Sequence, residues 1–298
     1  MTKLPQVSIG MPVYNAGNHI GLAIEGLLAQ SFGDFELIVS DNASSDSTRD
    51  VVEEYKQRDD RIRYERQPAN IGANANYSYV VRRARGEFFK WSSASDWCAP
   101  TFLEHCRNEL LAHGDTVLAV PKTRLFCDSL DTWQDYAWDI EVLDDASSAR
   151  LARLTAELAL NNAMNGLIRT SALRRTRLIE AYLSADVVLM GHLALLGKFR
   201  LLNERLLYRR MAVATATSLQ DRAAVWRHHY PQLTARTLFQ GSKRQVGWIR
   251  AALSVPMPIG ERARALKHIA KGCFWERKVF MQDLRGVWHY FVRRTWPH

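Results

Sequence analysis

Three apolar stretches in the N-terminal third of the chain each end in a short loop of small, polar and acidic residues. Each stretch has the length of one β-strand, and helical patterns separate the three. In an open α/β sheet, ligands bind beyond the carboxyl ends of the strands. Three strands with such endings therefore predict one polar site assembled from separate loops. The segments are residues 7–15, 37–46 and 88–96.

The composition is that of a folded globular protein, with 298 residues, 47% hydrophobic and 24% charged. The chain opens without a basic segment followed by an apolar stretch, and no stretch reaches the roughly 20 apolar residues that cross a bilayer. We therefore expect a cytoplasmic location. The four cysteines lack paired metal spacing, which predicts reduced cysteines without a metal.

Positive charge is concentrated toward the C-terminus. The net charge is +9, yet residues 222–298 contain 15 Lys and Arg against three Asp and Glu, so the preceding part is slightly acidic. This asymmetry predicts two regions with different roles. We place a catalytic domain at residues 1–218 and a basic, aromatic-rich helical region at residues 219–298, with one break at residues 256–260.

Strand and helix patterns alternate along the first region, which predicts an α/β fold. Right-handed crossovers then give a single, mostly parallel central sheet with helices on both faces. The expected strands include residues 35–40, 62–65, 87–91 and 116–121, with a closing strand pair at 199–202 and 206–208. The expected helices include one starting near residue 20, others ending near residues 58, 85 and 113, and one at about 148–160.

Six short motifs in this order resemble the family 2 glycosyltransferases. The resemblance covers about residues 5–215 and implies an inverting nucleotide-sugar enzyme with a single-domain GT-A fold. The motifs are residues 11–15, 41–48, 70–72 with Asn76, 95–96, 166–169 and 184–186.

The resemblance implies that the first two motifs bind the nucleotide. A carboxylate at Asp41 can accept a base N–H and reject a base that offers only acceptors. The family's habit favours UDP, with GDP and dTDP left open. For the first motif, a plain strand-to-helix turn is the alternative. The residues assigned to the nucleotide are Pro12, Val13, Tyr14, Asn15, Asp41, Asn70, Asn76 and Ser95.

The loop that ends in Asp96 matches the family's acidic metal motif. A hard divalent cation held by one or two carboxylates and by phosphate oxygens neutralises a leaving diphosphate. This chain has Ser95 where the family usually has another acid, and it retains Asp96. The resemblance thus implies Mn²⁺ or Mg²⁺ held through Asp96. The alternative is that Asp96 caps the helix that follows it.

Asp186 matches the family's catalytic base. An inverting transfer needs one carboxylate to take the proton of the acceptor hydroxyl, and it forms no glycosyl-enzyme intermediate. A cap for the following helix is the alternative role. Arg209 and Arg210 end the last predicted strand and suit bidentate contact with a diphosphate, although a solvated basic pair has the same sequence.

The tail from residue 273 to residue 296 mixes aromatic residues with Lys and Arg. This composition is typical of a helix at an anionic membrane surface, and equally of a helix docked on the catalytic domain or on a second subunit. No nucleic-acid motif accompanies the charge, so we expect no nucleic-acid partner.

These observations predict an inverting glycosyltransferase that moves a sugar, from a UDP-sugar by preference, to a hydroxyl of a glycan or lipid-linked acceptor in bacterial surface polysaccharide assembly. A non-catalytic sugar-nucleotide-binding or scaffold protein is the main alternative, motivated by Ser95 and opposed by Asp96 and Asp186. A nucleotidyltransferase would need a basic, glycine-rich loop after the first strand, and residues 14–18 contain no basic residue.

Overall fold

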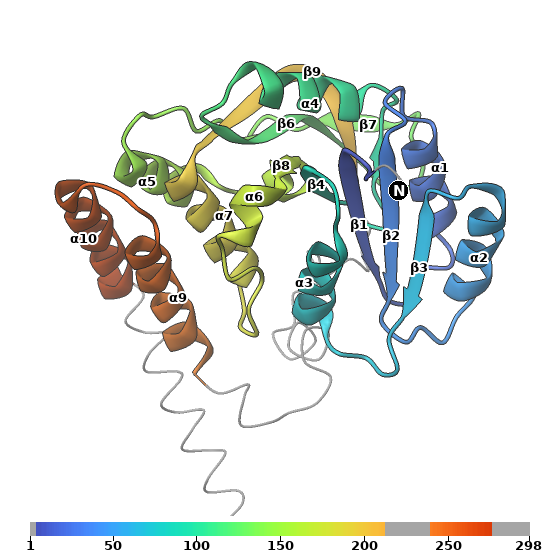
Figure 1. Cartoon of the computed structure of the whole chain (residues 1–298), viewed down its shortest axis with the longest axis horizontal. Helices are drawn as coiled ribbons and strands as arrows, with labels where there is room; N and C mark the ends of the chain where they lie inside the picture. The colour runs from blue at the N-terminus through green and yellow to red at the C-terminus, as the bar shows by residue number, and fades with distance from the viewer. Residues whose placement is uncertain (1–3, 212–238, 276–298) are drawn as a thin grey trace, which may run out of the picture.

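The computed structural model describes residues 4–211 and 239–275. A nine-stranded sheet forms the centre, in the order β3-β2-β1-β4-β8-β6-β9-β5 with β7 paired to β6, and helices cover both of its faces (Figure 1). The strands are β1 Val7–Val13, β2 Phe35–Asp41, β3 Ile62–Arg66, β4 Phe88–Trp91, β5 Trp97–Cys98, β6 Thr116–Phe126, β7 Trp133–Asp135, β8 Leu167–Arg169 and β9 Lys198–Arg210. The helices are α1 Ile20–Leu28, α2 Thr48–Arg58, α3 Ala73–Arg83, α4 Phe102–Ala112, α5 Ser147–Glu157, the 3₁₀ helix η1 Asn162–Asn165, α6 Thr170–Arg174, α7 Ala185–Leu196, α9 Gln240–Ser254 and α10 Ile259–Trp275.

The first four strands in chain order, β1 to β4, form the parallel part of the sheet. Val13, Asp41 and Arg66 lie side by side in register, so the polar loops after these strands share one edge. Beyond β4 the sheet is mixed, because β8 runs antiparallel to both β4 and β6, while β6 and β9 are parallel. The predicted α/β fold with helices on both faces is confirmed. The predicted parallel arrangement holds throughout β1 to β4, whereas the rest of the sheet is mixed.

Alternation along the central strands explains why both faces carry helices. Leu37 and Val39 pack in a core that includes α1 and α4, whereas Ile38 packs in the core of the opposite face. Phe88 and Phe89 divide between the two cores in the same way. A strand that is apolar on both sides must be covered on both sides.

The closing strand pair predicted for the catalytic region is wrong. The structure has one 13-residue strand, β9, which pairs with β6 along most of its length. The polar residues Asn203 and Glu204 lie at a register shift, between the pairs Pro121–Leu202 and Lys122–Arg205. A bulge therefore absorbs the residues that interrupt the apolar pattern.

Helices α9 and α10 pack on α5 and α7 (Figure 1). Trp248 is buried against Gly191 of α7, and Glu261 accepts hydrogen bonds from the backbone and hydroxyl of Ser148 at 3.0 and 2.6 Å. The predicted break is confirmed between α9 and α10. The boundary at residue 218 and the tail beyond Trp275 lie outside the described residues. Within residues 4–211 and 239–275, no helix is long and apolar enough to span a bilayer.

Candidate active site

The turn after β1 is tied to the loop after β2. Asn15 adopts a left-handed conformation, with φ of 50°, which asparagine tolerates better than most residues. Its backbone N–H donates to Ser44 Oγ at 2.9 Å, and its Oδ1 accepts from the Ser45 N–H at 2.9 Å. Of the other residues predicted here, Pro12 and Val13 are buried and Tyr14 is exposed.

Asp41 ends β2 and is fully buried. Its carboxylate accepts hydrogen bonds from the Ser44 N–H at 2.8 Å, the Tyr64 hydroxyl at 2.7 Å and Arg66 Nη1 at 2.8 Å. Burial and the bond to Asp41 raise the pKa of Tyr64 to about 12. Protein donors from β3 and the adjoining loop therefore fix this carboxylate at the carboxyl edge of the sheet.

Asn70 and Asn76 lie at the same edge and bind other protein groups. Asn70 Oδ1 accepts from Asn42 Nδ2 at 2.8 Å. Asn76 is buried on α3, where it accepts from the Ser40 hydroxyl at 2.6 Å and donates to the Ser40 carbonyl at 2.9 Å. Asn76 thus joins α3 to β2. We call Tyr14, Asn15, Asp41, Asn70 and Asn76 the nucleotide side of the site, after the role that the sequence predicts for them.

Asp96 is buried between β4 and the end of β9. Its Oδ1 accepts a hydrogen bond from the Arg210 N–H at 3.0 Å. Burial raises the pKa of Asp96, against the opposing effects of that bond and of the positive charges of Arg209 and Lys90. The alternative role as a helix cap is wrong, because α4 begins after Thr101 and the bond from Asp96 goes to β9.

The loop supplies one carboxylate for a cation. Ser95 Oγ lies 3.0 Å from Ser93 Oγ, and no group of three or more His, Cys, Asp or Glu among the described residues could enclose a metal ion. Mg²⁺ is commonly held through one or two carboxylates together with substrate phosphates. Asp96 could therefore hold a divalent cation together with the oxygens of a bound diphosphate, which would supply the remaining ligands.

The two arginines predicted for the diphosphate are placed differently. The positive charge of Arg209 acts on Asp96, and its Nη1 donates to Asn162 Oδ1 at 2.6 Å. Arg210 reaches Asp96 through its backbone, while its side chain donates to the Cys127 carbonyl at 2.8 Å and lies 2.6 Å from His19 Nδ1.

Asp186 lies in the first turn of α7 and is half-buried. Its Oδ2 accepts a hydrogen bond from Asn161 Nδ2 at 3.0 Å. The alternative role as a cap is wrong, because the helix begins after Ser184 and has no side-chain cap. The carboxylate is therefore held from the segment before η1.

Tyr77 of α3 connects these charged groups. Burial and the negative charges of Asp96 and Asp186 raise its pKa to about 12, while the positive charge of Arg209 acts in the opposite direction. Hydrogen bonds link the three groups through neighbouring residues: Asp96 accepts from the backbone N–H of Arg210, Arg209 donates to Asn162, and the adjacent Asn161 donates to Asp186. We call Tyr77, Asp96, Asp186 and Arg209 the catalytic side of the site.

Lys90 is a further member of this region, which the sequence motifs did not single out. It is 1% exposed, and its Nζ donates to the carbonyls of Trp91 and Asn165, each at 2.9 Å. The ammonium also lies 4.6 Å from the Phe102 ring centroid. Tyr77, Asn161 and Asn162 were missed as well, since each is a single residue outside the quoted motifs.

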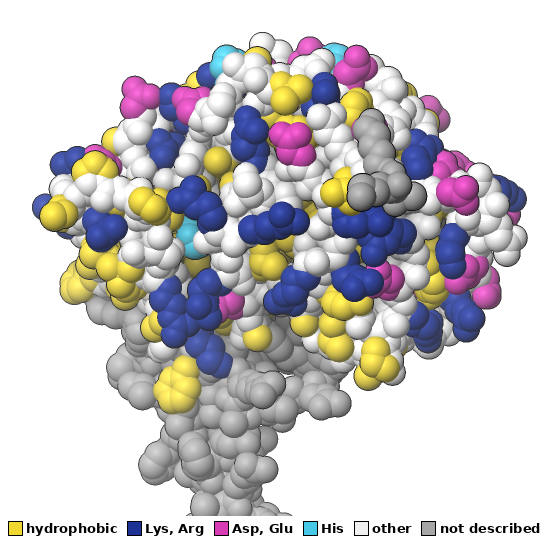
Figure 2. Space-filling model, viewed as in Figure 1, with side chains coloured by type: hydrophobic (Ala, Val, Ile, Leu, Met, Phe, Trp, Pro, Cys, Tyr) yellow, Lys and Arg dark blue, Asp and Glu magenta, His cyan; other side chains and the backbone are white. Residues whose placement is uncertain are grey.

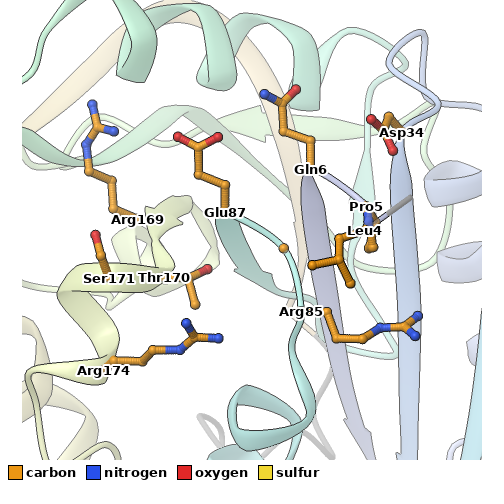
Figure 3. A pocket seen from close by; sticks show the side chains of 11 residues that line it. Leu4, Pro5, Gln6, Asp34, Arg85, Glu87, Arg169, Thr170, Ser171 and Arg174 are labelled. Carbon is orange, nitrogen blue, oxygen red and sulfur yellow. The ribbon is translucent and has the colours of Figure 1, made fainter. Parts of the chain in front are cut away.

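Several arginines also line a cavity away from this site. Figure 2 shows Lys and Arg across the face seen in Figure 1. Figure 3 shows the residues that line a cavity between α6 and the amino ends of β1 and β4, and the volume of this cavity is about 620 Å³. Two arginines that line this cavity bind protein groups: Arg85 pairs with Glu36 at 2.7 Å, and Arg169 donates to the Thr116 carbonyl at 2.8 Å. The third, Arg174, donates to the Ala84 carbonyl at 3.5 Å. Each arginine of this cavity is therefore bound to a protein group.

The sequence pattern of glycosyl transferase family 2 matches residues 8–183. The chain belongs to this family. The match confirms the resemblance predicted from the motifs and supports the predicted enzyme class. One relative is the GalNAc(5)-diNAcBac-PP-undecaprenol beta-1,3-glucosyltransferase of Campylobacter jejuni, which is 36% identical over 94 residues, or 31% of this chain and 30% of the relative. Matches to seven other relatives span 16–44% of their length.

Solved structures confirm the GT-A fold. S. aureus TarS 1-349 in complex with UDP-GlcNAc matches 90% of this chain and 72% of that chain, with a TM-score of 0.64 and 14% identity. The mannosyltransferase PcManGT from Pyrobaculum calidifontis, in complex with GDP-Man and Mn²⁺, matches 99% of this chain and 88% of that chain, with a TM-score of 0.51 and 15% identity.

Proposed function

We propose that the protein is an inverting glycosyltransferase of bacterial surface polysaccharide assembly. It takes a sugar from a nucleotide diphosphate donor, UDP-sugar by preference, and transfers it to a hydroxyl of a glycan or lipid-linked acceptor. The observation that carries this proposal is the set of hydrogen bonds that links Asp96, Arg209 and Asp186 through Arg210, Asn162 and Asn161. The family membership, the UDP-GlcNAc complex of TarS and the undecaprenol-linked substrate in the name of the Campylobacter relative support it.

In this mechanism the two sides of the site divide the work. The nucleotide side holds the base against Tyr14 and Asn15, beside the fixed carboxylate of Asp41. Arg209 faces the diphosphate and balances the charge that develops as the bond to the anomeric carbon breaks. Asp186 takes the proton of the acceptor hydroxyl while that oxygen attacks from the opposite face, which inverts the anomeric carbon.

A divalent cation, Mn²⁺ or Mg²⁺, would be held by Asp96 together with the diphosphate and would add charge neutralisation for the leaving group. The Mn²⁺ in the PcManGT complex supports this part of the proposal. Asp96 itself stays in place through the backbone of Arg210.

Calorimetric titration of the wild type with a panel of nucleotide sugars, in Mn²⁺ and then in EDTA, tests the proposal. We expect one nucleotide class to bind in a metal-dependent manner. Asp96→Asn should abolish this binding, whereas Asp131→Asn, at an exposed loop position, should keep it. Absence of binding by every donor would instead favour the non-catalytic scaffold, and binding that ignores metal would remove the cation from the account.

We also propose that the basic tail beyond the described residues contacts anionic membrane, on the basis of its composition alone. Sedimentation with vesicles of anionic lipid tests this, because a chain ending at residue 275 should lose binding that the full chain shows. Equal binding by both chains would contradict it.

A further inference from the structure

The short segment that contains Asn161 and Asn162 lies between the two charged groups that the proposed mechanism places on opposite faces of the donor sugar. We propose that Asn161 and Asn162 are positioning residues, Asn161 for the base Asp186 and Asn162 for the diphosphate-binding Arg209. This inference rests on the proposed function and adds to it the residues that set the geometry of the site.

Asn161 is directed at the base. Its Nδ2 donates to Asp186 Oδ2 at 3.0 Å. Its Oδ1 is buried and has no hydrogen-bond partner among the described residues. Rotating the amide by half a turn would bring this oxygen against the carboxylate, so the contact with Asp186 fixes the amide orientation. A buried acceptor without a partner lowers stability, so Asn161 is better explained by its contact with Asp186 than by a contribution to the fold.

Asn162 is directed at the arginine, and its orientation is also fixed. The residue is 1% exposed, and its Nδ2 donates to Asp139 Oδ1 at 3.0 Å. Asp139 is held by the backbone N–H and hydroxyl of Thr123, at 2.6 and 2.8 Å. Because the ionised carboxylate can only accept, the amide must turn its NH₂ group to Asp139 and its oxygen to Arg209, which donates at 2.6 Å.

Two consecutive asparagines thus present opposite ends of their amides to opposite charges. The donor end of Asn161 meets the anionic base, and the acceptor end of Asn162 meets the cationic guanidinium. Misplacing a reacting group by about 1 Å can lower a rate by about 100-fold. Neither asparagine needs to touch the substrate to influence the reaction.

The test measures donor affinity and donor hydrolysis, with water as the acceptor, in full-length variants. Asn161→Leu should lower the rate of nucleotide release about 10- to 100-fold, with donor Kd changed less than about twofold and with thermal stability equal or higher. Asn162→Leu should weaken donor binding about tenfold. Asn203→Ala, an exposed asparagine of β9 that accepts from Lys122, is the matched control and should alter neither quantity.

Double variants distinguish positioning from a general structural role. If Asn162 acts through Arg209, Asn162→Leu should have no further effect on donor affinity in an Arg209→Ala background. Likewise, Asn161→Leu should not slow an Asp186→Asn variant further. Additive losses would overturn the inference, as would unchanged turnover in Asn161→Leu together with unchanged affinity in Asn162→Leu.

The wild type separates this failure from that of the proposed function. An active wild type with unaffected variants contradicts only the positioning roles. A wild type that neither binds nor hydrolyses any nucleotide sugar contradicts the proposed function, and the inference is then rejected with it.

Discussion

The nucleotide side and the catalytic side of the site differ in how their polar groups are satisfied. On the nucleotide side, Asp41 accepts three hydrogen bonds and Asn76 binds β2 through both ends of its amide. On the catalytic side, Asp96 is buried with a raised pKa, and Asn161, which binds Asp186, keeps a buried oxygen without a partner in the part of the chain that the structure describes. The polar groups of the first side are satisfied by other protein groups, whereas the second side holds buried charge that a bound substrate would balance.

The two sides also differ in the interactions that keep them rigid. Hydrogen bonds hold the nucleotide side together, whereas α7, which carries Asp186, is supported by apolar packing against α9.

The largest expected effect is at the contact of α7 with α9. A Cβ at Gly191 would lie 2.0 Å from Trp248 Cζ3, so Gly191→Ala should displace α9 and lower the free energy of unfolding by about 3 kcal/mol. Urea denaturation measures this change. Gly114→Ala is the control, because a Cβ there meets nothing within 4 Å, and equal losses in both variants would show that packing at α9 is unimportant.

Asp41→Asn should be the next most damaging change. Asparagine has the same shape, but its NH₂ group would face one of three hydrogen-bond donors, the Ser44 N–H, the Tyr64 hydroxyl or Arg66. The substitution also removes the ion pair with Arg66. We expect a loss of about 2 kcal/mol in the free energy of unfolding, measured by urea denaturation. A fully stable variant would show that the nucleotide side does not depend on this carboxylate.

Acid should weaken the packing of α7 on α9. Burial lowers the pKa of His192 from 6.5 to about 4, and its Nε2 lies 3.1 Å from Ser254 Oγ of α9. Because the folded state favours the neutral ring, stability is complete above pH 6.5 and falls between pH 6.5 and 4, by about 2 kcal/mol at pH 5.

Thermal denaturation across this pH range measures the loss. His192→Gln should abolish this part of the pH dependence, whereas His113→Gln, at the partly exposed end of α4, should retain it. Parallel curves for wild type and His192→Gln would contradict the prediction.

The smallest effect should have the opposite sign to that of Asp41. Burial raises the pKa of Asp96, so the ionised carboxylate costs stability at neutral pH. Asp96→Asn should leave the free energy of unfolding unchanged or raise it by about 1 kcal/mol, while donor binding is lost. A clear loss of stability would show that Asp96, like Asp41, stabilises the fold, and it would remove the contrast between the two sides.

The first half of the fold was predictable from sequence because its signals are local. Apolar runs and helix periodicity placed β2, β3 and α1 close to their observed positions. β5 and β7 have two and three residues, and they exist through pairing with β9 and β6, which no local pattern reveals. The sequence predicts two strands in place of β9 because polar residues interrupt its apolar pattern. In the structure, a bulge keeps these polar residues within one strand.

The site was predictable where a motif carried it and hidden where partners come from distant elements. Asp41, Asp96 and Asp186 follow from motifs. Tyr77 and Asn162 owe their importance to neighbours far away in sequence, as in the bond between Asn162 and Arg209. Contacts between elements that are far apart in the chain leave no pattern in a single sequence.

The most direct test of the central claim separates binding from chemistry at Asp186. Donor Kd and the rate of nucleotide release would be measured in the same preparations of wild type, Asp186→Asn and the exposed control Asp131→Asn. The account predicts that Asp186→Asn binds donor as tightly as wild type and releases nucleotide at least about 100-fold more slowly, with the control unchanged. Wild-type turnover in Asp186→Asn, or an equal loss of binding and turnover, would contradict the assignment of the base to the catalytic side.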